Sequence, residues 1–170
     1  MPKPLLLTMG DPTGVGPELI VKALLEGAFD RLSHPLLVAG DAGVLERAAA
    51  IFAQPCAVTY GSGLVSHRLT IAGRTLDVHA LSALPASALQ YGRPTPECGR
   101  AMAEYIEWAC KRCQQGVAAG MVTAPINKAA IHGAGYDFPG HTELLAARCG
   151  VEKVVMMLGG ERLKVCLVTT

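Results

Sequence analysis

The stretch that decides the class of fold is LLLTMGDPTGVGPE, at residues 5–18. Residues 5–9 form a short strand-like run, and the loop from Gly10 to Gly16 follows it with three glycines that allow tight turns. Pro17 and Glu18 suit the first turn of a helix, because proline needs no hydrogen-bond partner there and a carboxylate complements the helix dipole. The stretch therefore predicts a strand, a loop and a helix that continues to Leu25.

The same alternation of strand-like and helix-like segments continues along the chain. A second strand is expected at 36–39, followed by a helix at 44–52 that Asp41 could cap. The segment 57–89 is less regular, with possible strands at 68–71 and 75–78. Further elements are expected in chain order: a long helix at 97–115, a buried strand at 121–124, helices at 127–133 and 142–149, and apolar strands at 154–158 and 163–170. Alternating strands and helices favour an α/β fold built from parallel βαβ units.

Composition excludes several classes of function. Of 170 residues, 51% are hydrophobic and 5% aromatic, and the net charge is +1 without a run of Lys or Arg. We therefore expect no nucleic-acid or membrane-surface partner. The apolar N-terminal run is too short for a signal peptide, and no apolar stretch approaches the roughly 20 residues of a membrane span. The interpretation is a cytoplasmic protein whose six cysteines are reduced and mostly buried.

Three motifs carry possible chemistry, and each also has a purely structural interpretation. The glycine loop at 10–16 could approach a ligand closely or simply turn the chain; it is neither a GxGxxG nor a Walker motif. In VTAPINK, at 122–128, Lys128 could hold a phosphate or carboxylate, or be a solvated residue behind an Asn127 cap. In FPGHTE, at 138–143, His141 would be neutral at a helix N-terminus, with Thr142 as a natural N-cap; the alternative is capping beside a surface histidine.

Other histidines and cysteines give weaker signals. Cys110 and Cys113 have CxxC spacing, but they fall inside the predicted long helix, and no second pair completes a zinc site. We assign them to helix packing. The remaining histidines share no ligand spacing and are interpreted as structural: His34, His67, His79 and His132.

Taken together, these segments resemble the 4-hydroxythreonine-4-phosphate dehydrogenase family. The similarity covers residues 10–18, 122–128, 140–143, 154–158 and 165–170, in matching order and spacing over essentially the whole chain. It implies the isocitrate/isopropylmalate dehydrogenase-like fold, a homodimer of two-lobed α/β/α subunits with the active site between lobes. Residues 1–170 would be the N-terminal portion of such a protein, truncated, with the C-terminal half absent.

The resemblance also implies a reaction. The family oxidises the 3-hydroxyl of 4-phosphooxy-L-threonine with NAD or NADP, and loss of CO2 then gives 3-amino-2-oxopropyl phosphate, a precursor of pyridoxal phosphate. A divalent metal (Zn, Mg, Mn or Co) held by three histidines would bind the substrate oxygens as a Lewis acid. Relatives acting on threonate or erythronate phosphates share the motifs. Alone, the 170 residues would be inactive, or a silent module that only binds a ligand or partner.

Carried over residue by residue, the resemblance places His141 and Thr142 against the substrate. Asp11 and Lys128 match family motifs without an assigned role. No metal ligand falls within the chain, because the family's first metal histidine directly follows the pair that corresponds to Thr169 and Thr170.

We predict that the codon after Thr170 in the gene encodes histidine. Sequencing past this point checks the expectation. Any other residue there would contradict the proposed metal ligand.

Overall fold

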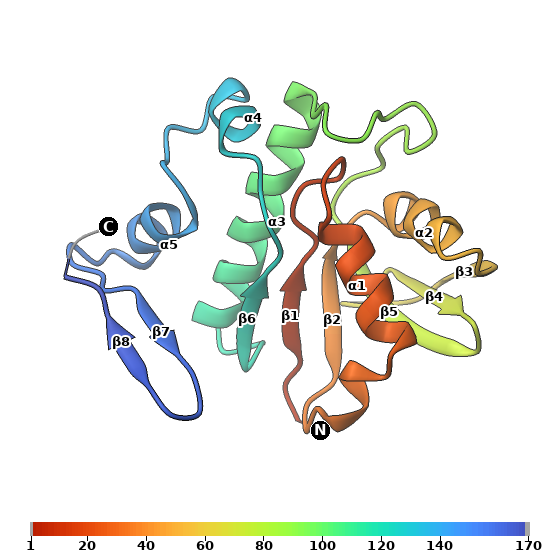
Figure 1. Ribbon diagram of the computed structural model, residues 1–170, viewed down its shortest axis with the longest axis horizontal. Helices are drawn as coiled ribbons and strands as arrows, with labels where there is room; N and C mark the ends of the chain where they lie inside the picture. Colours follow the sequence, from red (N-terminus) through yellow and green to blue (C-terminus); the bar gives the residue numbers. More distant parts are fainter. Residues whose placement is uncertain (1, 169–170) are drawn as a thin grey trace.

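The computed structural model describes residues 2–168, which form three layers, α/β/α, as predicted (Figure 1). A six-stranded sheet with strand order β3-β4-β5-β2-β1-β6 lies between the helices. In chain order the elements are β1 (Leu5–Thr8), α1 (Gly16–Leu25), a 3-10 turn (Ala28–Arg31), β2 (Leu36–Gly40), α2 (Ala42–Ile51), β3 (Cys56–Tyr60), β4 (His67–Ile71), β5 (Arg74–Ala80), α3 (Pro96–Gln114), β6 (Gly120–Thr123), α4 (Lys128–Gly133), α5 (His141–Cys149), β7 (Met157–Gly159) and β8 (Lys164–Cys166).

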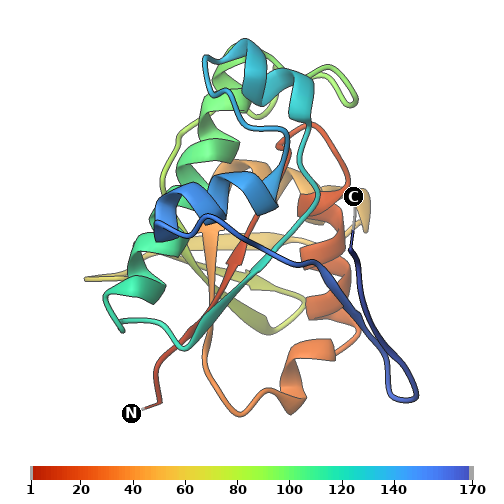
Figure 2. The same ribbon diagram turned by 90° about the vertical axis from the view of Figure 1, so that its left-hand side faces the viewer.

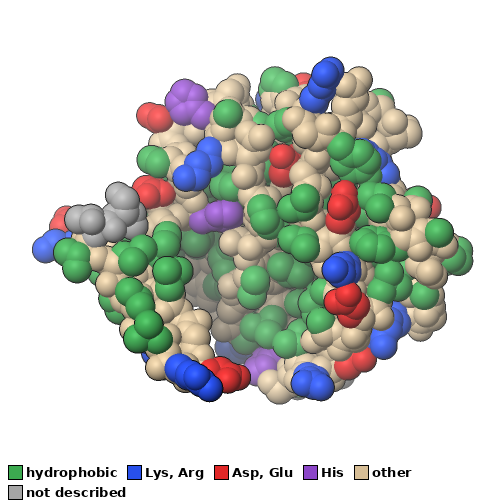
Figure 3. All heavy atoms as spheres, viewed as in Figure 1, with side chains coloured by type: hydrophobic (Ala, Val, Ile, Leu, Met, Phe, Trp, Pro, Cys, Tyr) green, Lys and Arg blue, Asp and Glu red, His purple; other side chains and the backbone are tan. Residues whose placement is uncertain are grey.

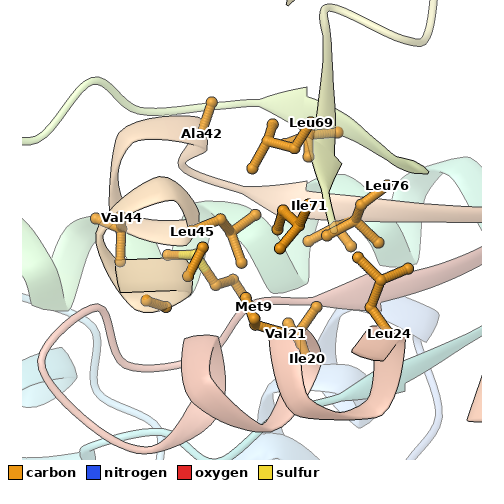
Figure 4. Close-up of a cluster of buried hydrophobic side chains, with 14 of the residues drawn as sticks. Met9, Ile20, Val21, Leu24, Ala42, Val44, Leu45, Leu69, Ile71 and Leu76 are labelled. Carbon is orange, nitrogen blue, oxygen red and sulfur yellow. The ribbon is translucent and has the colours of Figure 1, made fainter. Parts of the chain in front are cut away.

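Side chains alternate between the two faces of the sheet and so pack against both helix layers. Met9 and Val38 lie in the main hydrophobic core together with residues of α1 and α2. Figure 4 shows this core. Leu6 and Leu37 point the other way and pack with Ala109 of α3. Figure 2 shows α1 and α3 on opposite sides of the sheet. This two-sided burial explains the near-continuous apolar runs of the central strands.

Asp41 caps α2, as predicted, and also accepts hydrogen bonds from the segment that follows β5. Its Oδ1 accepts a hydrogen bond from the Val44 backbone N–H at 3.1 Å. Its Oδ2 accepts from the Ser82 hydroxyl at 2.7 Å and the Leu84 N–H at 2.8 Å. The carboxylate is 1% exposed, so these donors replace the water it loses on folding.

The expected parallel pairing is confirmed for β1, β2, β5 and β6, while the remaining strand pairs of the sheet are antiparallel. β1 pairs in parallel with β2 and β6, and β2 pairs in parallel with β5. β3, β4 and β5 instead form consecutive antiparallel pairs. β3 was not predicted, because it is the edge strand and four of its five residues are exposed. An exposed edge strand lacks the apolar alternation that marks a half-buried one.

The last two predicted strands do not join this sheet. β7 and β8 are shorter than predicted and pair only with each other, as an antiparallel hairpin. Figure 3 shows apolar side chains gathered on this hairpin. The large apolar residues exposed there are Val154, Val155, Met156, Met157, Leu158, Leu163 and Val165. Thr169 and Thr170, with which the second predicted strand ended, lie outside the described residues.

No helix within residues 2–168 combines the length and the apolar character that crossing a membrane requires.

The pairing of β1 with β6 brings two distant motifs together. Thr8 is opposite Thr123 in the register, so the loops after both strands leave the sheet side by side. The Asp11 N–H donates to the Pro125 carbonyl at 2.9 Å. β6 was predicted to be buried, but it is the other edge strand, and Val122 is 57% exposed.

Gly10 permits this close approach of the two loops. Its φ is 75°, and a Cβ atom on it would lie 2.3 Å from the Pro125 carbonyl oxygen. Both facts disfavour any other residue: a side chain destabilises the left-handed conformation, and here it would also push against backbone.

We predict that Gly10→Ala destabilises the protein more than the matched control Gly73→Ala. Gly73 has nearly the same φ, 76°, but a Cβ atom there would meet nothing within 4 Å. The control should lower the free energy of unfolding by about 1–2 kcal/mol for the dihedral alone. Gly10→Ala should exceed it by at least about 1 kcal/mol for the clash. Urea unfolding of both variants measures the difference, and equal losses would contradict the close contact.

Candidate functional site

The candidate site lies where β1 and β6 end, on the side of the sheet at which ligands of open α/β proteins bind. The loops after these strands carry two of the three predicted motifs, and α4 and α5 follow β6 directly. A hollow of about 460 Å³ lies elsewhere: it is lined by Asp30, Arg74 and Asp77, at the amino ends of β2 and β5. We attach no chemistry to that hollow, because Arg74 and Asp30 already neutralise each other across it at 2.8 Å.

The glycine loop after β1 is held by Asp11. Its Oδ1 accepts hydrogen bonds from both the backbone N–H and the hydroxyl of Thr13, each at 2.8 Å. Asp11 is 7% exposed and Thr13 is 1% exposed. These bonds give Asp11 a structural role in shaping the loop, the role that the sequence left open.

The loop after β6 places Lys128 at the start of α4. The Asn127 side chain accepts from the Ala130 N–H at 3.0 Å, so the predicted cap is confirmed. Lys128 is exposed, but it does not simply point into solvent. A Cβ atom on Gly140 would lie 3.4 Å from the Lys128 Cε and 3.6 Å from its Nζ. The ammonium therefore lies beside the backbone immediately before His141.

Lys128 forms no ion pair within the described residues, although the Glu143 carboxylate lies nearby: a Cβ atom on Gly140 would be 3.4 Å from the Glu143 Oε2 and 3.6 Å from the Lys128 Nζ. Among residues 2–168, no carboxylate lies within ion-pairing distance of its ammonium, whereas the neighbouring His132 is 3.6 Å from Asp137. An unpaired ammonium at the carboxyl end of a sheet can attract an anionic group of a ligand.

His141 is the first residue of α5 and faces this lysine. Its Nε2 is buried and has no hydrogen-bond partner among the described residues. Burial, and to a lesser degree the positive charge of Lys128, lower the pKa of His141 below its usual 6.5. The N-terminal end of a helix dipole also disfavours a positive charge. At neutral pH the ring is therefore uncharged, as expected from the sequence, and its nitrogens can donate or accept one hydrogen bond each.

The predicted capping role of Thr142 is wrong. The N-cap of α5 is Gly140, no side chain caps the helix, and Thr142 is the second helical residue. Its half-buried side chain stands next to His141, at the start of the same helix turn. Sequence reasoning missed the closeness of Lys128 to Gly140. Gly140 is the N-cap with an extended backbone, φ −179°, and a Cβ atom there would make only ordinary van der Waals contacts with Lys128, so the glycine itself was no signal of this closeness.

Of the other histidines, His132 lies on α4 and lines the same hollow as Lys128. His79 stacks on Trp108 with ring centroids 4.3 Å apart, and its Nδ1 is 2.8 Å from the Leu64 carbonyl oxygen. Within residues 2–168, no group of three or more His, Cys, Asp or Glu side chains could hold a metal ion. The expectation of mostly buried cysteines holds for Cys98 and Cys110, while Cys149 and Cys166 are exposed and the other two are half-buried.

Comparison with known proteins gives the family. The sequence model described as "Pyridoxal phosphate biosynthetic protein PdxA" matches residues 31–170. The chain belongs to the PdxA family. The predicted family resemblance is thereby confirmed over most of the chain. The matched region includes the motifs at residues 125–128 and 140–143.

Curated PdxA-family relatives carry two different names. A 4-hydroxythreonine-4-phosphate dehydrogenase of Trichlorobacter lovleyi is 41% identical over 169 residues, which is 99% of this chain and 50% of the relative. A D-threonate 4-phosphate dehydrogenase of Cupriavidus necator is 37% identical over 164 residues, 96% of this chain and 48% of the relative. The chain thus spans about half the length of the curated relatives it matches.

The fold agrees with the family. A crystal structure of a 4-hydroxythreonine-4-phosphate dehydrogenase from Burkholderia phymatum superposes with a TM-score of 0.84 at 36% identity, covering 99% of this chain and 50% of that one. The α/β fold predicted from the sequence is therefore the PdxA-family fold.

We predict that replacing Lys128 raises the pKa of His141 without restoring its usual value. In Lys128→Met the charge effect is lost, but burial, the larger cause, remains. NMR titration of the His141 ring protons measures its pKa in the unchanged protein and in Lys128→Met. Because the folded pKa is lowered, the unfolded state binds the proton first, so this histidine makes stability fall as pH drops below about 6.5. A pKa unaffected by the substitution would show that the ammonium does not face the ring.

Proposed function

We propose that this PdxA-family protein is an NAD- or NADP-dependent 4-hydroxythreonine-4-phosphate dehydrogenase. It would oxidise the 3-hydroxyl of 4-phosphooxy-L-threonine, passing the hydride to the nicotinamide, and the resulting 3-oxo acid would lose CO2 to give 3-amino-2-oxopropyl phosphate. Family membership and the names of the relatives support the class of reaction. The single observation that carries the proposal is a Lys128 ammonium without an ion pair beside the half-buried His141, whose Nε2 has no hydrogen-bond partner among the described residues.

In this proposal Lys128 attracts an anionic group of the substrate, a phosphate or a carboxylate. The substrate carries both, and an ammonium binds either as a point charge. A hydrogen bond to a charged group contributes about 1.5–3 kcal/mol, which is enough to change an affinity about 10- to 100-fold.

His141 and Thr142 would orient the substrate once it is bound. The buried Nε2 has no hydrogen-bond partner among the described residues, so a substrate oxygen or hydroxyl can bond to it. Since the ring is neutral, it positions a polar group without competing with Lys128 for the negative charge.

The metal and the nicotinamide rest on the family resemblance. A divalent metal would stabilise negative charge on the substrate oxygen as a Lewis acid. The described residues hold no suitable ligand group, and their sequence has no GxGxxG loop for the nicotinamide cofactor. We therefore derive no step for either from Lys128, His141 or Thr142.

The assembly and location are proposed on the same basis. We propose that residues 1–170 form the N-terminal part of a two-lobed subunit, that the subunits pair as a homodimer, and that the protein acts in the cytoplasm. In that setting the described residues would supply one wall of the site.

A second candidate activity has direct support from a relative's name. The Cupriavidus necator relative is a D-threonate 4-phosphate dehydrogenase and is 37% identical, against 41% for the Trichlorobacter lovleyi relative. The two substrates differ at carbon 2, where one has an ammonium and the other a hydroxyl. Turnover of both substrates by the complete protein, compared as kcat/KM, distinguishes the two activities.

We predict that Lys128→Met raises KM for the phosphorylated substrate about 10- to 100-fold in the complete protein. The physical reason is the loss of a positive charge that forms no ion pair within residues 2–168. Steady-state kinetics with 4-phosphooxy-L-threonine measure the change. His141→Ala should also reduce kcat/KM while leaving the far-UV circular dichroism unchanged.

Two matched controls separate these effects from general changes of charge. Lys22→Met removes an exposed lysine that pairs with Glu26 on α1. His132→Ala removes an exposed histidine of α4. Both should leave the kinetics unchanged. Normal KM in Lys128→Met, or equal losses in the controls, would rule out the proposed anion site.

A further inference from the structure

Helix α5, which begins with His141 and Thr142, is held to the rest of the chain by few contacts. Leu144 is its only buried residue. Near its C-terminal end, Arg148 forms an ion pair with Glu107 of α3, and its backbone carbonyl accepts from the Gln114 side chain at 2.7 Å. The position of the candidate site residues therefore depends on a small contact between α5 and α3.

A pair of thiols lies within this contact. The Cys110 and Cys149 sulfur atoms are 3.9 Å apart, although 39 residues separate them in sequence. Glu107, Cys110 and Gln114 are spaced three and four residues apart, so they share the face of α3 that α5 covers. Cys149 is exposed and Cys110 is buried.

The CxxC spacing gives Cys110 a second possible partner, but the helix excludes it. Cβ atoms three residues apart on a helix are about 5–6 Å from each other. A disulfide needs a Cβ separation of about 3.5–4.5 Å. Cys110 and Cys113 both lie inside α3, so they cannot pair without unwinding it. The cysteine across the contact can reach Cys110 by rotation of the side chains.

We propose that Cys110 and Cys149 are a redox modification site, at which a peroxide forms a reversible disulfide that fixes α5 to α3. This inference concerns a reaction separate from the proposed dehydrogenase activity. Most disulfides in reducing compartments are of this transient kind.

The reaction takes place in two balanced steps. The exposed Cys149 thiol attacks the peroxide, the O–O bond breaks, and one water leaves as the sulfenic acid forms. The Cys110 sulfur then attacks the Cys149 sulfur. The S–O bond breaks, and the departing hydroxide takes the Cys110 proton to form a second water. Two thiols have been oxidised by two electrons, and a thiol reductant reverses the change.

The order of the two steps follows from exposure. Burial is the main cause that raises the pKa of Cys110 to about 11, so this residue is a thiol at neutral pH and reacts slowly with a dissolved oxidant. Cys149, at the surface, meets the oxidant first, and its sulfenic acid is then attacked at close range by the neighbouring Cys110.

The test is hydrogen peroxide treatment of the complete protein, followed by alkylation of the remaining thiols and peptide mapping without reductant. We expect the loss of two titratable thiols, and a linked Cys110–Cys149 peptide pair lighter by two hydrogen atoms that dithiothreitol separates. Cys149→Ser should abolish the link, and Cys56→Ser should leave its yield unchanged. A Cys113–Cys149 link, or Cys149 oxidised further without any link, would overturn the proposal.

Hydrogen exchange provides a second measurement that does not depend on activity. Amides of α5 should exchange more slowly in the oxidised protein than in the reduced one, because the bond prevents the helix from separating from α3. Peroxide should produce no such slowing in Cys149→Ser. Equal exchange of α5 in the oxidised and reduced protein would show that the bond, if formed, does not fix the helix.

Discussion

The close contact between the loop after β1 and the loop after β6 is the constraint on which the candidate site depends. Gly10 allows the Pro125 carbonyl to approach, and the Asp11 N–H binds that carbonyl. This contact helps to place the start of α4, because Asn127, its N-cap, follows Pro125 by two residues. If the two loops were further apart, Lys128 would be displaced with them.

The two sides of the candidate site differ in how deeply their residues are buried. Asp11 and Thr13 are almost fully buried, whereas Lys128 is exposed and His141 is half-buried. The loop side of the site is therefore rigid, and the helix side rests on a small contact between α5 and α3. Regions with few buried apolar contacts open at lower free energy than the core. A site with one rigid side and one adjustable side can admit a ligand and still hold it in a fixed orientation.

The sequence predicted the regular parts of the fold well. β1, α1 and α2 were found because their apolar spacing is clear and because Asp41 is a strong capping residue. β3 was missed, since an exposed edge strand carries no such spacing. The hairpin of β7 and β8 was predicted as two strands, but its exposure could not be foreseen. An apolar run indicates that a segment is buried, and it does not identify the surface that covers the segment.

The candidate site was only partly predictable for a related reason. Family motifs gave His141 and Thr142, but not the closeness of His141 to Lys128, which depends on how residues 134–140 return to the sheet. Similarly, CxxC spacing drew attention to Cys110 and Cys113, while the nearer partner, Cys149, belongs to a different helix. Spacing along the chain describes neighbours within an element, and contacts between elements need the fold itself.

The pairing of β1 with β6 also bears on the order in which the protein folds. β4 and β5 are joined by a two-residue turn, whereas Leu5 and its partner Gly120 are 115 residues apart in sequence. Closing a long loop costs more conformational entropy than closing a short one, so the antiparallel side of the sheet is expected to form first. The edge that carries the candidate site would then be completed last. A newly made chain would have a recognisable core well before this edge is formed.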